Sequence, residues 1–285
     1  MLRLSRPIHL LLAALTYTLG AGIPSYLGDF LQAFIFILGL AGVLLAQLSM
    51  SLLAEVFRPH NEALIENETP QQKETLRNNL LYISIAALTV TAFIIYLLYL
   101  NQSLTLSSFL FFLSSFILIL SYAIPPIRLL NRGFGELALA AHIAYIIPSI
   151  GFLLQAKENH RLLIIILIPL TTLALACFLA LNFPTYAEDE KYQRGTFLRL
   201  LTWERALPLH HNLIIFTYSI FSIALLLGFS VLWPAFLTLP FALLQIALLQ
   251  NISHGSKPNW TLLNVTALAV FGLTVYFLTL TFWNR

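Results

Sequence analysis

Nine separate runs of mostly apolar residues constrain the fold of this chain more than any other feature. The hydrocarbon core of a bilayer is about 30 Å thick, so a helix needs about 20 residues to cross it. A membrane-spanning strand would have about ten residues with strict alternation, and none of these runs alternates. The runs predict an all-α polytopic membrane protein with spans at about 8–27, 30–57, 79–100, 104–124, 136–156, 161–183, 211–232, 234–251 and 260–283.

The composition supports a membrane protein. Of the 285 residues, 59% are hydrophobic and 9% are charged, whereas soluble domains are about 45–50% apolar and about 25% charged. A water-soluble fold could not cover its surface with so few charges, and we expect one transmembrane domain over residues 1–285. The single cysteine, Cys177, excludes a disulfide framework. A net charge of +3 gives no indication of nucleic-acid binding.

The connections between the runs differ in length and charge. Residues 58–78 and 184–210 are long and polar, and residues 125–135 form a shorter basic link. Twelve Lys and Arg residues lie on the side of these loops, and three lie on the other side. Positively charged loops stay in the cytoplasm. We therefore expect a cytoplasmic N-terminus, an outside C-terminus and an integral protein of the cell (inner) membrane.

The first long loop begins with a charged segment. Glu55, Arg58 and Glu62 are spaced to share one face of a helix, although Pro59 predicts that the helix ends or kinks there. Glu55 lies within the apolar register, where an ionisable side chain is costly unless it faces a polar cavity. A cavity with carboxylates at the membrane surface suits a hard cation such as Mg²⁺.

The second long loop carries a similar segment. Thr185 and Asp189 are one helical turn apart, and Lys191 and Arg194 follow them. This loop follows the sixth span as the first loop follows the second span. We expect the two segments to meet at the inner membrane surface around one anionic headgroup. Solvated loop charge is the alternative interpretation.

Four further polar residues are candidates for a cavity site. Tyr122 and Arg128 frame the turn after the fourth span, Asn182 ends the sixth span, and His142 lies inside the fifth. An ionisable side chain inside a membrane is by default a functional candidate. Three of them have a structural alternative: Tyr122 as an interfacial tyrosine, Asn182 as a cap of the bent helix, and His142 as a histidine that faces a carbonyl.

Three stretches, taken in order, resemble the UbiA superfamily of intramembrane prenyltransferases. "LRLSRPIHLLLAALTYTLGAG" resembles the family's entry to the first span, and "SYAIPPIRLLNRGFGELALA" resembles its segment after the fourth. "NFPTYAEDEKYQRGTFLRLL" resembles its second acidic motif, with Thr196 at the family's helix-opening threonine. The match covers nearly the whole chain, including nine spans with acidic loops after the second and sixth.

The resemblance implies a helical bundle around a central cavity. It implies transfer of a prenyl group from a prenyl diphosphate to a small, often aromatic acceptor, as in quinone-type lipid synthesis, with Mg²⁺ as cofactor. The implied catalytic carboxylates are Glu55, Glu62 and Asp189, with Glu55 and Asp189 as metal ligands. From the residues of this sequence we expect the diphosphate contacts to be Arg58, Lys191, Arg194 and Arg128, and the acceptor or cavity residues to be Tyr122, Asn182, His142 and Thr185.

The acidic motifs depart from the family pattern. The family's first motif reads Asn-Asp, two residues, Asp, three residues, Asp, and here the corresponding positions are Ala54, Glu55, Arg58 and Glu62. The second motif has two aspartates four residues apart in the family, and here the first of them is Thr185. Three carboxylates and one arginine therefore replace five carboxylates.

Three functions stay open after this comparison. In the first, Arg58 replaces one metal ion, and a single Mg²⁺ on Glu55 and Asp189 completes a diphosphate clamp. In the second, the metal site has been lost and the bundle binds a lipid or stabilises a complex without chemistry. The third is a small-solute transporter, which would usually carry its polar groups at the bilayer midplane rather than at one membrane face.

Overall fold

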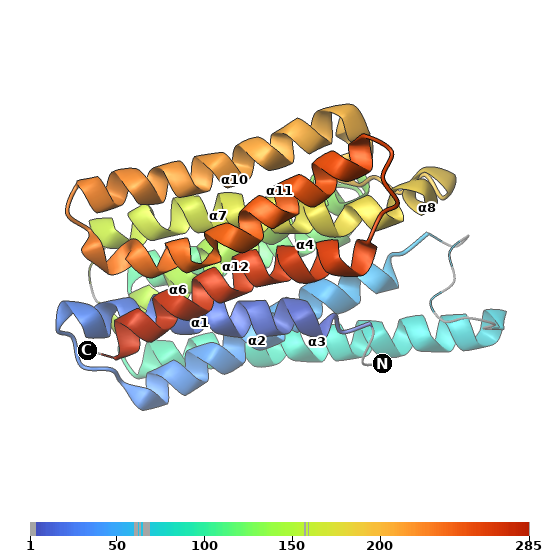
Figure 1. Ribbon diagram of the computed structural model, residues 1–285. Helices are drawn as coiled ribbons and strands as arrows, with labels where there is room; N and C mark the ends of the chain where they lie inside the picture. The colour runs from blue at the N-terminus through green and yellow to red at the C-terminus, as the bar shows by residue number, and fades with distance from the viewer. Residues whose placement is uncertain are drawn as a thin grey trace.

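The computed structural model describes residues 4–59, 62, 64, 69–156, 158 and 160–284. These residues form an elongated bundle of roughly parallel and antiparallel helices (Figure 1). In chain order the elements are α1 Pro7–Leu27, α2 Ala33–Val56, α3 Pro70–Leu100, α4 Leu106–Ala123, η1 Leu129–Asn131, α5 Gly135–Ala141, η2 His142–Ile146, α6 Ile147–Gln155, α7 Arg161–Asn182, η3 Phe183–Thr185, α8 Tyr186–Lys191, α9 Phe197–Leu201, α10 Trp203–Leu226, η4 Ser230–Thr238, α11 Leu239–Ser253 and α12 Trp260–Trp283.

The predicted all-α fold class is confirmed. Within the described part of the chain, nine helical stretches are long and apolar enough to cross a membrane. Two of them begin earlier than the hydropathy predicts. The third starts at Pro70 rather than near residue 79, because Thr69 and Gln72 form a capping box around its first turn. The seventh starts at Trp203 rather than near residue 211.

The fifth span is one stack of three helical pieces, and a π-helical turn, η2, separates α5 from α6. His142 opens that turn with a fully buried side chain. Its Nδ1 lies 2.8 Å from Oε1 of Gln47 on α2, and its Nε2 lies 2.8 Å from Oγ of Ser115 on α4. His142 therefore links the fifth span to α2 and α4 inside the bundle.

Small residues let the central helices approach closely. α1 packs on α6, and a Cβ atom at Gly20 would overlap the backbone of Pro148. At the far end of α12, Nε1 of Trp283 donates to the carbonyl of Thr18 at 3.0 Å. α1 therefore lies between α6 and α12, and α7 packs on α10 and α12.

The chain ends and loops divide between the two ends of the bundle. The starts of α1 and α3, the end of α2, and α8 lie at one end, and the end of α12 lies at the other (Figure 1). α2 ends at Val56, shortly before Pro59, as the proline predicts. We call the end that carries Arg6, Arg58 and Arg194 the polar end.

Candidate functional site

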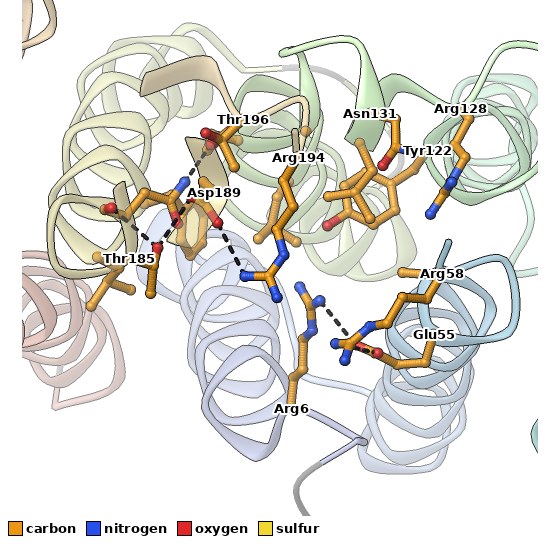
Figure 2. A pocket seen from close by; sticks show the side chains of 18 of the residues that line it. Arg6, Glu55, Arg58, Tyr122, Arg128, Asn131, Thr185, Asp189, Arg194 and Thr196 are labelled. Atoms are coloured by element: carbon orange, nitrogen blue, oxygen red, sulfur yellow. Dashed lines mark hydrogen bonds and ion pairs between the residues drawn. The ribbon is translucent and has the colours of Figure 1, made fainter. Parts of the chain in front are cut away.

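A cavity of about 240 Å³ opens at the polar end of the bundle. Figure 2 shows its charged side chains, which come from segments far apart in the sequence. Among the described residues that line it, four are arginines and four are carboxylic acids: Arg6, Arg58, Arg128 and Arg194, and Glu55, Glu62, Glu136 and Asp189. Formal positive and negative charge are thus equal in this lining.

The first acidic segment is bound by two arginines. Glu55, in the last turn of α2, is 3% exposed. Its Oε1 lies 3.0 Å from Nη2 of Arg6, just before α1, and its Oε2 lies 2.6 Å from Nη2 of Arg58. Arg58 also lies 3.9 Å from Oε2 of Glu62. The buried charge of Glu55 is therefore compensated from both sides, as burial of a carboxylate requires.

Arg194 joins the second acidic segment to the first. Its Nη1 lies 3.1 Å from Oδ1 of Asp189, and its Nε lies 3.1 Å from Oε1 of Glu62. The hydroxyl of Thr185 donates to Oδ2 of Asp189 at 3.2 Å. Burial by itself would lower the pKa of Arg194, but the bonds to Glu62 and Asp189 raise the pKa above its ordinary value. Residues 132 positions apart, Glu62 and Arg194, thus meet at one site.

These contacts form one continuous series of alternating charges. In spatial order the series runs Arg6, Glu55, Arg58, Glu62, Arg194 and Asp189. Each carboxylate accepts from a guanidinium, and Glu55 and Glu62 each contact two. We call this series the charge chain. The ion pair between Glu62 and Arg194 links the two loops at the polar end.

Glu136 is a buried acid that the sequence analysis did not select. It lies in the first turn of α5, and its carboxylate accepts from the backbone N–H of Phe197 at 3.0 and 3.1 Å. The side-chain amide of Asn182 also donates to it. Glu136 therefore holds the start of α9 against α5 and α7. Its position at the start of an apolar run is the signal that could have identified it.

The segment between α8 and α9 is fixed by a close backbone approach. A Cβ atom at Gly195 would overlap the carbonyl group of Asn131 in η1. Thr196 accepts from the N–H of Arg199 at 3.3 Å and caps α9. Glycine at 195 thus allows the second loop to lie directly on η1, which places the preceding residue, Arg194, in the cavity.

Arg128 differs from the other three arginines of the lining. Its backbone has φ +36°, a left-handed conformation that costs free energy for a residue other than glycine and that Arg6 shares at φ +48°, so the difference lies in its contacts. Its guanidinium points into the pocket (Figure 2), yet among the described residues it forms no ion pair and its buried Nε has no hydrogen-bond partner. Burial lowers the pKa of Arg128, and Glu62 partly opposes that effect.

Nine of the eleven predicted site residues line this cavity. They are Glu55, Arg58, Glu62, Tyr122, Arg128, Asn182, Thr185, Asp189 and Arg194. The lining does not include Lys191, which is exposed with its ammonium 5.4 Å from the ring centre of Tyr192, or His142, which bonds within the bundle. Sequence reasoning missed Arg6 as a site residue, because 49 positions separate it from its partner Glu55.

Solved structures of UbiA homologues from Archaeoglobus fulgidus have a similar fold. One bound to Cd²⁺ aligns with 99% of this chain and 98% of its own, with a TM-score of 0.63 and 18% sequence identity. One bound to DMAPP and Mg²⁺ aligns with 97% of this chain and 98% of its own, with a TM-score of 0.64 and 17% identity. The chain has the UbiA fold.

A further structure and two sequence comparisons complete these findings. A third structure, bound to GPP and Mg²⁺, aligns with a TM-score of 0.57 and 17% identity over 97% of this chain and 98% of its own. No protein-family model matches the sequence, and no curated protein matches it. Together with the nine apolar stretches, the UbiA fold makes this an integral membrane protein.

The carboxylates of this UbiA-fold chain, as they are arranged, do not fit a Mg²⁺ site. Mg²⁺ needs near-octahedral oxygen ligands, usually one or two carboxylates together with water and phosphate. Here Glu55, Glu62 and Asp189 each accept from an arginine, and the described residues contain no group of three His, Cys, Asp or Glu side chains placed to hold a metal ion. In Figure 2 the guanidinium groups of Arg6 and Arg194 lie between Glu55 and Asp189.

Proposed function

We propose that this protein is an intramembrane prenyltransferase of the UbiA superfamily. It binds a prenyl diphosphate with the diphosphate in the cavity at the polar end, and it transfers the prenyl group to a small aromatic acceptor. The loops of the polar end face the cytoplasm, as the distribution of Lys and Arg predicts. The observation that carries this proposal is the convergence of four arginines on one cavity in this fold.

The cavity suits a diphosphate headgroup. Guanidinium groups bind phosphate oxygens through charge-assisted, often bidentate hydrogen bonds, and they stay protonated at any physiological pH. The described lining contains no lysine, so its permanently cationic donors are all guanidinium groups, which can bind phosphate in a bidentate manner. His9 and Phe178 pack edge to face with ring centres 5.6 Å apart on the same wall. The aromatic rings of His9 and Phe178 therefore line the cavity together with the charged side chains.

The reaction follows from this placement. The bond between C1 of the prenyl group and the diphosphate oxygen breaks, and the oxygen keeps the electron pair. Guanidinium donors stabilise the charge that develops on the leaving diphosphate, which lowers the barrier to its departure. A ring carbon of the acceptor forms the new bond to C1, and the acceptor then loses its proton to water or a nearby carboxylate. Ring faces of the wall stabilise the allylic cation by cation–π attraction.

Binding and transfer are tested separately with the full chain in detergent. Geranyl diphosphate should raise the melting temperature, and Arg194→Gln should reduce that rise because it removes a donor from the cavity. Membranes that contain the protein should then convert labelled geranyl diphosphate into a labelled lipid-soluble product and free pyrophosphate. Absence of any geranyl diphosphate binding would remove the proposal, and the exposed Arg205→Gln serves as the matched control.

A non-catalytic lipid-binding protein is the second candidate. The equal numbers of arginines and carboxylic acids in the described lining favour it, because such a site satisfies its own charges without a substrate. This candidate predicts geranyl diphosphate binding with no labelled product and no free pyrophosphate. The transfer assay therefore decides between the two functions.

A further inference from the structure

Among the arginines of the described lining, Arg128 is the one that forms no ion pair. Arg6, Arg58 and Arg194 each contact a carboxylate. Arg128 contacts none among the described residues. Burial lowers its pKa most and the positive charges of Arg58 and Arg77 lower it further, while the carboxylates around the cavity, Glu62 foremost, only partly oppose these effects. A half-buried guanidinium beside like charges is unfavourable unless an anion joins it. The chain nevertheless holds Arg128 at a strained φ of +36°, directed into the cavity.

Arg194 has donor capacity left over as well. Its Nε and Nη1 bond to Glu62 and Asp189, and within the described structure its Nη2 has no protein partner. Arginine carries five N–H donors, so the charge chain uses only part of this one. Both arginines thus present unused N–H groups to the same cavity.

A divalent cation is disfavoured where these groups meet. It would lie among four guanidinium groups, and its carboxylate ligands would first have to leave arginine partners 2.6 to 3.1 Å away. Two charges 4 Å apart interact by about 4 kcal/mol at the effective dielectric of a protein surface, so repulsion from several guanidiniums is substantial. An anion meets the opposite situation, since Arg128 and Arg194 offer it unused N–H donors while the carboxylates that would repel it already accept from protein donors.

We infer that this cavity binds a diphosphate through guanidinium groups in place of a divalent cation, with Arg128 as the side chain that the anion engages first. This inference rests on the proposed function, because it specifies how the same cavity holds its substrate. The unused donors support it: the diphosphate supplies the hydrogen-bonded anion that Arg128 lacks among the described residues. The carboxylates then act as partners that orient Arg6, Arg58 and Arg194 rather than as metal ligands.

The test is calorimetric titration of the purified full chain with geranyl diphosphate, once in excess EDTA and once in Mg²⁺. We expect similar affinity in both. Arg128→Gln should weaken binding by about 10- to 100-fold in EDTA, which is the range for hydrogen bonds to a charged group. Arg205→Gln, an exposed arginine at the start of α10 outside the cavity lining, should bind as the unmodified chain does.

Each other outcome has a distinct meaning. Binding only in the presence of Mg²⁺ would overturn this inference and leave the proposed function standing. Binding in neither buffer would overturn the proposed function itself. Binding in EDTA that Arg128→Gln leaves unchanged would overturn the role of Arg128. Should that variant fail to fold, Arg128→Lys, which keeps the charge and loses the planar fork, replaces it. Unchanged affinity in Arg128→Lys would again contradict the role.

Discussion

The strongest consequence of the charge chain is energetic coupling between Arg194 and Asp189. Their ion pair spans 3.1 Å, with Asp189 3% exposed and Arg194 31% exposed. Arg194→Gln removes two charge-assisted bonds, each worth about 1.5–3 kcal/mol when well formed. Glu62 keeps Arg58 at 3.9 Å and Asp189 keeps Thr185 at 3.2 Å, and the arginine is partly solvated. We therefore expect a loss of about 2–3 kcal/mol in the free energy of unfolding.

The coupling appears in a double-mutant cycle. Asp189→Asn alone removes the buried charge and leaves Arg194 with only Glu62, so it should cost about 1–2 kcal/mol. In the double variant no unpaired charge remains at position 189. The double variant should therefore lose less than the sum of the single variants, with a coupling energy of about 1–2 kcal/mol.

Unfolding by sodium dodecyl sulfate in mixed micelles, followed by tryptophan fluorescence, measures these free energies where the transition is reversible and two-state. Arg205→Gln, which alters an exposed arginine outside the cavity, should change the free energy of unfolding by less than about 0.5 kcal/mol. Additive effects within about 0.5 kcal/mol would show that the two residues do not interact in the membrane protein, and the argument for a site closed by Arg194 would fail.

Three other substitutions probe separate parts of the structure. Glu136→Ala leaves the N–H of Phe197 and the amide of Asn182 without their acceptor and should cost about 2–4 kcal/mol, whereas Glu136→Gln should cost less; unfolding in mixed micelles compares them. Gly195→Ala should cost about 1–3 kcal/mol, because its Cβ would overlap Asn131, while Gly272→Ala, whose Cβ would meet only Leu12 at 3.7 Å, should be nearly neutral by the same measurement. His142→Leu strands Gln47 and Ser115 and should cost about 1–3 kcal/mol, yet leave geranyl diphosphate affinity unchanged in calorimetric titration; weaker binding would contradict its purely structural role.

The spans were predictable from the sequence because hydropathy is a local property. Runs such as 136–156 and 260–283 correspond closely to the observed helices. The start of α3 at Pro70 was missed, because its first turns are polar and stabilised by a cap rather than by lipid. The π-helical turn at His142 was missed as well, since the bonds that accompany it come from two other spans.

The site was predictable only in part, for a related reason. Glu55, Glu62 and Asp189 stand out because carboxylates are rare near apolar runs, and the cavity contains all three. Their partners do not stand out in the same way. Arg6 is one arginine ahead of an apolar run, and its bond to Glu55 exists only after α1 and α2 have packed. Pairing across the bundle is a tertiary property, so the change from surplus carboxylate to balanced charge became evident only with coordinates.

The arginines of the cavity divide into two kinds, and this division separates a structural pocket from a binding site. Arg194 is paired with buried carboxylates, so its loss should lower stability first and ligand affinity second. Arg128 is half-buried without a bonded carboxylate among the described residues, and burial lowers its pKa most, so its loss should relieve the cost of burying that charge. Arg128→Gln should therefore leave the free energy of unfolding unchanged or slightly raised while it weakens the binding of a prenyl diphosphate. A substitution that raises stability and weakens binding indicates that the residue serves ligand binding rather than folding. If Arg128→Gln lowered the free energy of unfolding as much as Arg194→Gln, Arg128 would have a structural role, and the argument that it serves ligand binding would fail.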